Sequence, residues 1–156
     1  MKIISPWWLP GGHLQTILPA LASRHNRSAR DLGAPDYRRE RWTTPDGDFI
    51  DVDWQDPSSG GTVPLLVLFH GLEGSSRSHY ARAFARYASQ QGWAFVVPHF
   101  RGCSGELNHA PRAYHSGGHE EIGWVMQRLR RQTSGPLMAV GVSLGGNALL
   151  RWAQEA

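Results

Sequence analysis

The sequence predicts an α/β fold, a mostly parallel sheet covered by helices on both faces. From about residue 62, short apolar segments alternate with longer amphipathic ones in the order strand, helix, strand, helix, strand, helix, which is typical of parallel sheets. The first apolar segment, Leu65–Phe69, is hydrophobic throughout, as strands covered on both faces are. With 156 residues, 40% hydrophobic and 19% charged, the chain can form one packed domain, and its composition argues against disorder.

Residues 1–39 are predicted to be a lead-in and connector that precedes the domain proper. Trp7 and Trp8 stand between prolines, apolar residues follow at helical spacing from position 14 to 21, and a polar stretch continues to residue 39. We favour packing of the apolar part across the core of its own domain. An interfacial lid or a peripheral contact with a membrane surface stays open as the alternative, because amphipathic aromatic segments also bind there.

The domain expected over residues 40–156 begins with a hairpin. Strands at Arg41–Thr44 and Phe49–Trp54 flank Pro45-Asp46-Gly47, a tripeptide typical of turns. In the second strand, apolar residues at 50, 52 and 54 alternate with polar ones, so we expect one buried face and one solvated face. The strand–helix pairs follow, with strands at 65–69, 95–97 and 137–142, helices at 77–91, 119–132 and 145–156, and a polar loop at 99–118.

The positive charge of the chain is almost entirely arginine. The formal net charge is +3, Lys2 is the one lysine, and six arginines fall between residues 24 and 41 among acidic neighbours. Such a cluster could face an anionic partner, but no zinc-finger, RNA-binding-sheet or helix-turn-helix pattern accompanies it. We therefore expect a solvated connector with local ion pairs and no nucleic-acid partner.

Cysteine and histidine usage excludes several classes of site. The single cysteine, Cys103, rules out an internal disulfide framework and a cysteine-rich zinc site. His109, His115 and His119 suggest metal ligation, but no carboxylate is placed to join them, so we expect loop hydrogen bonds and no metal. Phosphate-loop and dinucleotide fingerprints are absent, so no cofactor is expected. No apolar run approaches the roughly 20 residues of a membrane span and no signal peptide is evident, so a cytoplasmic protein is expected.

The strongest chemical motif is Gly141-Val142-Ser143-Leu144-Gly145-Gly146, which lies between a predicted buried strand and a predicted helix. A G-x-S-x-G in that context is a nucleophile elbow, a strained turn that exposes the serine hydroxyl at a helix N-terminus. The glycines let the turn tighten without a Cβ clash, and the helix dipole favours a developing anion. We predict that Ser143 is a nucleophile; the alternative is a helix-capping serine in an ordinary tight turn.

A second motif, His70-Gly71-Leu72-Glu73-Gly74, follows the strand 65–69 directly. Folds with a nucleophile elbow place part of the oxyanion hole in this first strand–helix loop. The backbone N–H groups of Leu72 and Leu144 are therefore the predicted oxyanion donors. We expect His70 to brace this loop through hydrogen bonds, because it precedes the predicted nucleophile in the chain.

The chain resembles the α/β-hydrolase superfamily and, within it, the YheT-like family. The resemblance implies a serine carboxylic-ester hydrolase that acts on a small-molecule or lipid ester, with Ser143 as its nucleophile. It carries no role to His13, Tyr114 or His115. The matching segments cover nearly the whole chain and comprise Pro6–Pro10, Gly12–Thr16, His70–Ser76, Arg101–Glu106, Pro111–Gly117 and Gly141–Asn147.

The resemblance also implies that the catalytic set is incomplete. In this superfamily the acid and the histidine follow the serine, yet all eight histidines precede Ser143 and the one later acid is Glu155. We expect the N-terminal half of a hydrolase domain, truncated after the nucleophile helix, whose partner is the missing C-terminal half. The strand 137–142 would then be an exposed edge, and the isolated chain would aggregate. The alternative is a catalytically silent pseudo-hydrolase or interaction module.

Overall fold

The computed structural model describes residues 11, 18, 35–58, 60–110 and 118–156. Its contacts divide the chain into residues 1–34 and residues 35–156, and the second unit holds the strands and helices discussed below. Several expectations fall outside the described residues: the Trp7–Trp8 lead-in with most of the apolar stripe, His13, and the segment with Tyr114 and His115.

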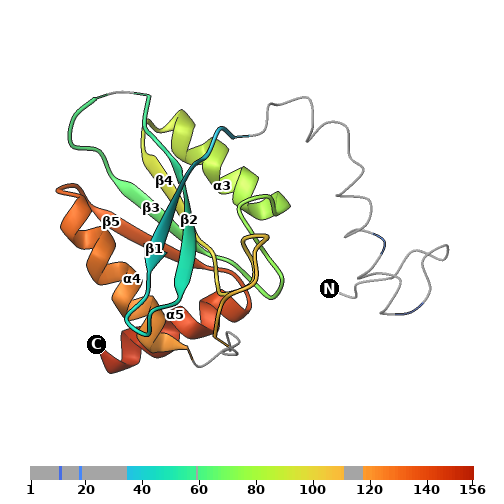
Figure 1. The fold of residues 1–156 in the computed structure, drawn as a ribbon. Coiled ribbons are helices and arrows are strands. Elements are labelled where there is room, and N and C mark those ends of the chain that lie inside the picture. Colours follow the sequence, from blue (N-terminus) through green and yellow to red (C-terminus); the bar gives the residue numbers. More distant parts are fainter. Residues whose placement is uncertain (1–10, 12–17, 19–34, 59, 111–117) are drawn as a thin grey trace. The chain divides into compact units, whose positions relative to one another are not determined.

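The second unit contains one sheet of five strands and three helices (Figure 1). The three predicted strand–helix pairs are confirmed in type and order, and the predicted strand at 65–69 and helix at 119–132 have the expected bounds. In chain order the elements are β1 Arg38–Thr43, β2 Phe49–Gln55, β3 Leu65–Phe69, α3 His79–Gln90, β4 Ala94–Pro98, α4 His119–Gln132, β5 Leu137–Gly141 and α5 Leu144–Glu155.

The sheet is mixed, with the strand order β1-β2-β4-β3-β5. Strand β3 pairs in parallel with β4 and β5, as the alternation of strands and helices predicts. The hairpin β1–β2 joins this parallel part through an antiparallel pairing of β2 with β4. The carboxyl ends of β3, β4 and β5 therefore meet at one edge of the sheet, where α/β folds place their sites.

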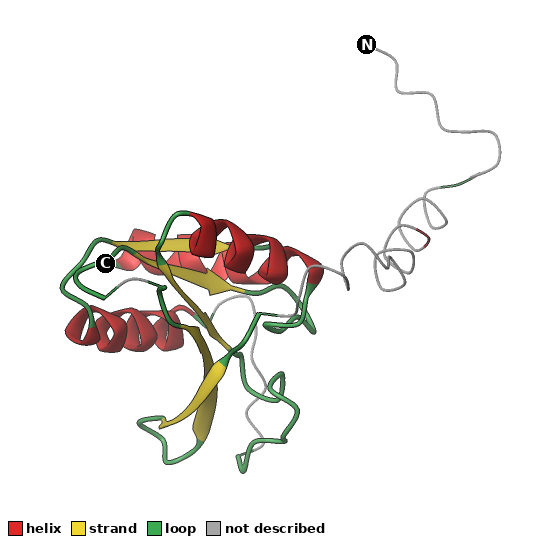
Figure 2. Cartoon of the chain, turned by 90° about the horizontal axis from the view of Figure 1, so that it is seen from above, coloured by secondary structure: helices red, strands yellow, loops and turns green. Residues whose placement is uncertain are grey.

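Helices cover both faces of the sheet (Figures 1 and 2). On one face, three small buried residues of α3 (Ala81, Ala85 and Ala88) pack against apolar side chains of β3 and β4. On the other face, α4 and α5 bury Ile122, Val125, Leu129 and Ala148 against β2, β3 and β4. This two-layered core is what holds the strand ends in place.

The polar face of β2 is buried, so the predicted alternation of a buried and a solvated face is wrong. Asp51 and Asp53 are only 1% and 3% exposed. In the antiparallel register Arg41 lies opposite Asp51 and Arg39 opposite Asp53, and each guanidinium makes two hydrogen bonds to its carboxylate. The ion pairs expected for the arginine cluster are present for its described members, Arg38, Arg39 and Arg41, but they lie on a hairpin whose first strand begins at Arg38.

Candidate active site

Ser143 lies in a strained turn between β5 and α5. Its backbone has φ 52° and ψ −116°, a conformation that is rare for a residue with a side chain. The residue is exposed, and its side chain makes no hydrogen bond that caps α5. The alternative of an ordinary helix-capping serine therefore has no support in the geometry.

The glycines around Ser143 are required by close backbone contacts. A Cβ on Gly141 would lie 2.4 Å from the Gly146 Cα atom, and one on Gly145 would lie 2.3 Å from the Phe69 carbonyl oxygen. Real Cβ atoms do not approach other atoms so closely. The tight turn that exposes Ser143 therefore depends on glycine at both positions, as the motif predicts.

The loop after β3 lies directly beside this turn. The Val142 N–H donates a hydrogen bond to the Phe69 carbonyl at 3.0 Å, which continues the parallel pairing of β3 and β5 past Gly141. A Cβ on Gly71 would lie 3.4 Å from the Ser143 Cβ. The structure thus brings the two predicted motifs together, although about 70 residues separate them in the chain.

The loop forms a tight turn over residues 71–74. The Gly74 N–H donates to the Gly71 carbonyl at 2.9 Å, and Glu73 has a positive φ of 51°. Among the described residues, no group accepts a hydrogen bond from the backbone N–H of Leu72 or of Leu144. Both predicted oxyanion donors are therefore uncommitted within the described part of the chain.

His70 braces the loop, as predicted. Its side chain is buried, the Phe100 N–H donates to Nε2 at 3.0 Å, and Nδ1 is 2.8 Å from the Gly71 carbonyl. Because Nε2 accepts, the ring proton sits on Nδ1 and is donated to Gly71. Burial lowers the pKa of His70 to about 4, the Gly71 bond opposes this, and the neighbouring His99 adds to it. Both nitrogens are occupied, so His70 does not serve as a base for Ser143.

A further contact to this loop was missed by the sequence analysis. The Gly71 N–H donates to the Tyr80 hydroxyl at 3.0 Å. The helical periodicity predicts only that Tyr80 lies on the apolar side of the helix after the loop. The ring of Tyr80 does pack against the core, but no sequence pattern indicates that its hydroxyl turns back to Gly71.

Asp53 is the centre of a buried polar cluster that includes Ser76, which follows the loop. It accepts hydrogen bonds from Arg39, from Ser76 Oγ at 2.6 Å and from His99 Nε2 at 2.8 Å. Burial alone would raise the pKa of Asp53, but these hydrogen bonds outweigh it and hold the pKa well below its usual range. The cluster ties β1, β2 and the segments after β3 and β4 to one another.

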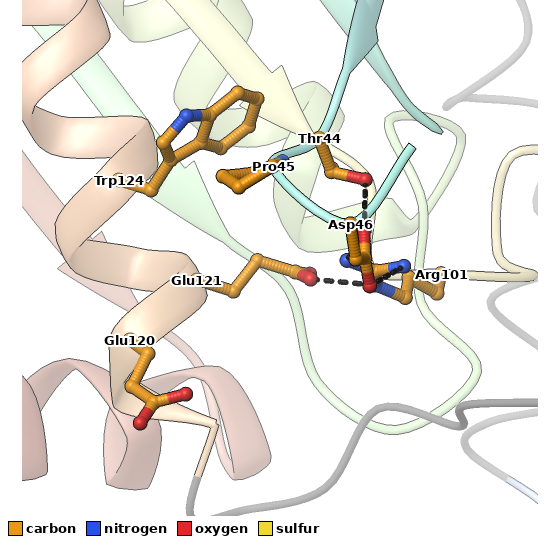
Figure 3. Close-up of a pocket in the computed structure, with 7 residues that line it drawn as sticks. All are labelled: Thr44, Pro45, Asp46, Arg101, Glu120, Glu121 and Trp124. Atoms are coloured by element: carbon orange, nitrogen blue, oxygen red, sulfur yellow. Dashed lines mark hydrogen bonds and ion pairs between the residues drawn. The ribbon is translucent and has the colours of Figure 1, made fainter. Parts of the chain in front are cut away.

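A second polar cluster surrounds Arg101. Figure 3 shows its guanidinium between Asp46 and Glu121, in the wall of a cavity of about 150 Å³. Asp48 contacts Arg101 and accepts hydrogen bonds from the Asn108 side chain and from the backbone of Ala110 and His109. These hydrogen bonds keep the pKa of Asp48 below the usual range despite burial. The cavity is lined by Thr44, Pro45, Asp46, Arg101, Glu120, Glu121 and Trp124.

The described residues form no group of three or more His, Cys, Asp or Glu side chains that could hold a metal ion. His109 and His119 are described, whereas His115 is not. Cys103 forms no disulfide, and its side chain is half-buried. Within the described part of the chain, no helix is both long enough and apolar enough to traverse a bilayer.

Comparison with known proteins gives one consistent family. Residues 64–156 match the family model of the alpha/beta hydrolase fold. The chain is 46% identical over 139 residues to a protein of Escherichia coli (strain K12) with the provisional name esterase YheT, covering 88% of this chain and 39% of that protein. It is 32% identical over 123 residues to phospholipase ABHD3 of Bos taurus, covering 74% of this chain and 30% of that protein.

A solved structure supports the same fold. The alpha/beta hydrolase GrgF from Penicillium sp. sh18 superposes with a TM-score of 0.62 at 15% identity, covering 76% of this chain and 41% of that one. At this identity the likeness concerns the fold alone. The chain spans well under half the length of each of these relatives.

Proposed function

Because the chain belongs to the α/β-hydrolase family, we propose that it supplies the nucleophile and the oxyanion hole of a serine ester hydrolase. One observation carries the proposal. The exposed Ser143, in its strained turn, lies beside a loop from β3, and the backbone amides of Leu72 and Leu144 there have no partner among the described residues. A capping serine or a structural turn needs neither the strain nor the two free donors.

The proposed reaction is acyl transfer. Ser143 Oγ attacks the ester carbonyl carbon, a base takes the hydroxyl proton, and the carbonyl oxygen becomes an oxyanion held by the Leu72 and Leu144 amides. The intermediate collapses, the bond to the alcohol breaks, and the proton passes from the base to the leaving alcohol. Water then attacks the acyl-serine in the same way and regenerates Ser143.

The base and its acid are proposed to lie in the part of the relatives' length that this chain does not span. Both nitrogens of His70 are engaged in hydrogen bonds to the loop and to Phe100, so His70 is not available as the base. In the family, the acid and the histidine follow the serine along the chain. Residues 1–156 alone are therefore proposed to be catalytically silent, and the missing C-terminal half is their partner in catalysis.

The proposed substrate class is an ester with an apolar acyl or alcohol group. The support is the Leu72 side chain, which is 68% exposed and follows Gly71, where a Cβ would lie 3.4 Å from Ser143 Cβ. An exposed leucine beside the reacting serine gives an apolar chain a surface to contact. One relative of this chain carries the name phospholipase, which agrees with an ester of this kind.

The test is ester hydrolysis by the native-source protein that contains this chain, after its intact mass has been measured. We expect a mass well above 17.4 kDa and hydrolysis of p-nitrophenyl esters that Ser143→Ala abolishes. The matched control is Ser89→Ala, because Ser89 is exposed on α3, and it should retain full activity. Full activity in Ser143→Ala would refute the proposal.

A further inference from the structure

We infer that Tyr80 is a positioning residue that sets which amide of the loop 71–74 faces the oxyanion. The inference rests on the proposed function. The Gly71 and Leu72 amides are consecutive in the loop whose Gly71 lies against Ser143, so either amide could donate to a ligand there. The Gly71 N–H is committed to the Tyr80 hydroxyl at 3.0 Å, whereas the Leu72 N–H has no described partner. Tyr80 thereby reserves the Leu72 amide for the oxyanion.

The orientation of the Leu72 N–H follows from the planarity of the peptide bond. The Gly71 carbonyl and the Leu72 N–H belong to one rigid unit and point in opposite directions. Two donors hold that carbonyl, the Gly74 N–H at 2.9 Å and His70 Nδ1 at 2.8 Å. The Leu72 N–H therefore points away from His70 and Gly74.

Tyr80 fixes the peptide unit on the other side of Gly71. That unit joins His70 to Gly71, and its N–H donates a hydrogen bond to the Tyr80 hydroxyl. Glycine otherwise rotates freely about both of its backbone bonds, so one fixed plane alone would leave the loop loose. Tyr80 holds the peptide unit before Gly71, and His70 and Gly74 hold the peptide unit after it. Both backbone dihedral angles of Gly71 are therefore fixed.

The residues around the Tyr80 hydroxyl leave space for it. A Cβ on Gly74 would lie 2.3 Å from the Tyr80 hydroxyl oxygen, so glycine at 74 leaves the space that the phenol uses. At the start of α3, Ser75 and Ser78 exchange hydrogen bonds: the Ser75 N–H donates to Ser78 Oγ, and the Ser78 N–H donates to the Ser75 carbonyl, both at 3.0 Å. These bonds fix the helix turn that carries Tyr80 relative to the loop.

The experiment compares Tyr80→Phe with Tyr87→Phe in the native-length protein. Tyr87 is on the same helix, is exposed and packs its ring on Trp93, so the control removes a hydroxyl that does not touch the loop. We measure kcat and KM for a p-nitrophenyl ester, and amide exchange of Gly71 after labelling with ¹⁵N-glycine. Tyr80→Phe should lower kcat on the order of tenfold to a hundredfold, leave KM within about twofold, and speed Gly71 exchange. Tyr87→Phe should change none of these.

The outcomes separate this inference from the proposed function. Unchanged kcat or unchanged Gly71 exchange in Tyr80→Phe, with an active wild type, overturns the inference and leaves the hydrolase proposal standing. An inactive native-length wild type overturns both. If Tyr80→Phe does not fold, amide exchange of Gly71 is measured in the wild-type protein instead, because its N–H donates to the Tyr80 hydroxyl. Slow exchange of this amide is expected, and exchange as fast as in an unprotected glycine overturns the inference.

Discussion

At the residue scale, Gly145, two residues after Ser143, is as important to the tight turn as Ser143 is to the proposed chemistry. A Cβ at position 145 would lie 2.3 Å from the Phe69 carbonyl oxygen and 2.5 Å from that of His70, and both acceptors are rigid backbone. Gly145→Ala should therefore lower the unfolding free energy by about 1–3 kcal/mol and reduce the reactivity of Ser143. Urea unfolding and ester hydrolysis measure the two effects.

The matched control for this glycine is Gly60→Ala. A Cβ there meets nothing within 4 Å, and the backbone φ of Gly60 is not positive. Its unfolding free energy and activity should equal those of the wild type. Wild-type activity in Gly145→Ala would mean that the elbow is not as tight as the contacts indicate.

His70 gives a pH dependence with a definite sign. Its pKa is about 4 in the fold against 6.5 in an exposed histidine, chiefly because it is buried. Between these values the unfolded chain binds a proton that the folded chain does not, so stability is complete above pH 6.5 and falls as the pH drops toward 4. The loss should amount to about 3 kcal/mol in urea unfolding at pH 7 and pH 4. His70→Asn should remove this contribution to the slope, and His79→Asn, at an exposed position on α3, should keep it.

Leu72 determines how apolar substrates are recognised in the proposed account. Leu72→Ser keeps the backbone amide but removes the exposed apolar side chain. We expect kcat/KM for an octanoate ester to fall on the order of tenfold relative to an acetate ester, because burial of apolar surface against Leu72 is lost. An equal decrease in kcat/KM for both esters would contradict contact between the acyl chain and Leu72.

At the element scale, the hairpin β1–β2 is held by charge pairs that cross it. Asp53→Asn removes the acceptor shared by Arg39, Ser76 and His99 and should lower the unfolding free energy by about 2–3 kcal/mol. Asp56→Asn is the control, since its pair with Arg38 is exposed, and it should stay within about 0.5 kcal/mol of the wild type. An equal decrease in unfolding free energy for the two variants would show that the buried cluster stabilises the fold no more than an exposed ion pair does.

The elements themselves were largely predictable from the sequence. Periodicity and the turn at Pro45–Gly47 place every strand and helix of residues 38–155, because those signals are local. The burial of Asp51 and Asp53 was not predictable, because it depends on which arginines of β1 lie opposite them in the register. The hydrogen bond from Gly71 to Tyr80 was missed for the same reason: a tyrosine on an apolar helix face gives no sign of where its hydroxyl points.

At the scale of the whole molecule, β5 is the strand that invites a further partner. Within the described part of the chain it pairs with β3 alone, and every residue of it is half-buried. Unpaired backbone groups on an apolar edge strand promote association. Residues 1–156 expressed alone should elute as oligomers or aggregates in size-exclusion chromatography. A monomer with a sharp, cooperative melting transition would contradict this expectation.

The most direct test of the central claim is reaction of the native-source protein with a fluorophosphonate, followed by peptide mapping of the modified residue. Such probes modify serines activated by a base and an oxyanion hole. The account predicts a single modification, on Ser143, that Ser143→Ala abolishes and Ser89→Ala preserves. Modification of another serine, or none in a folded and complete protein, would contradict the assignment of Ser143 as the nucleophile.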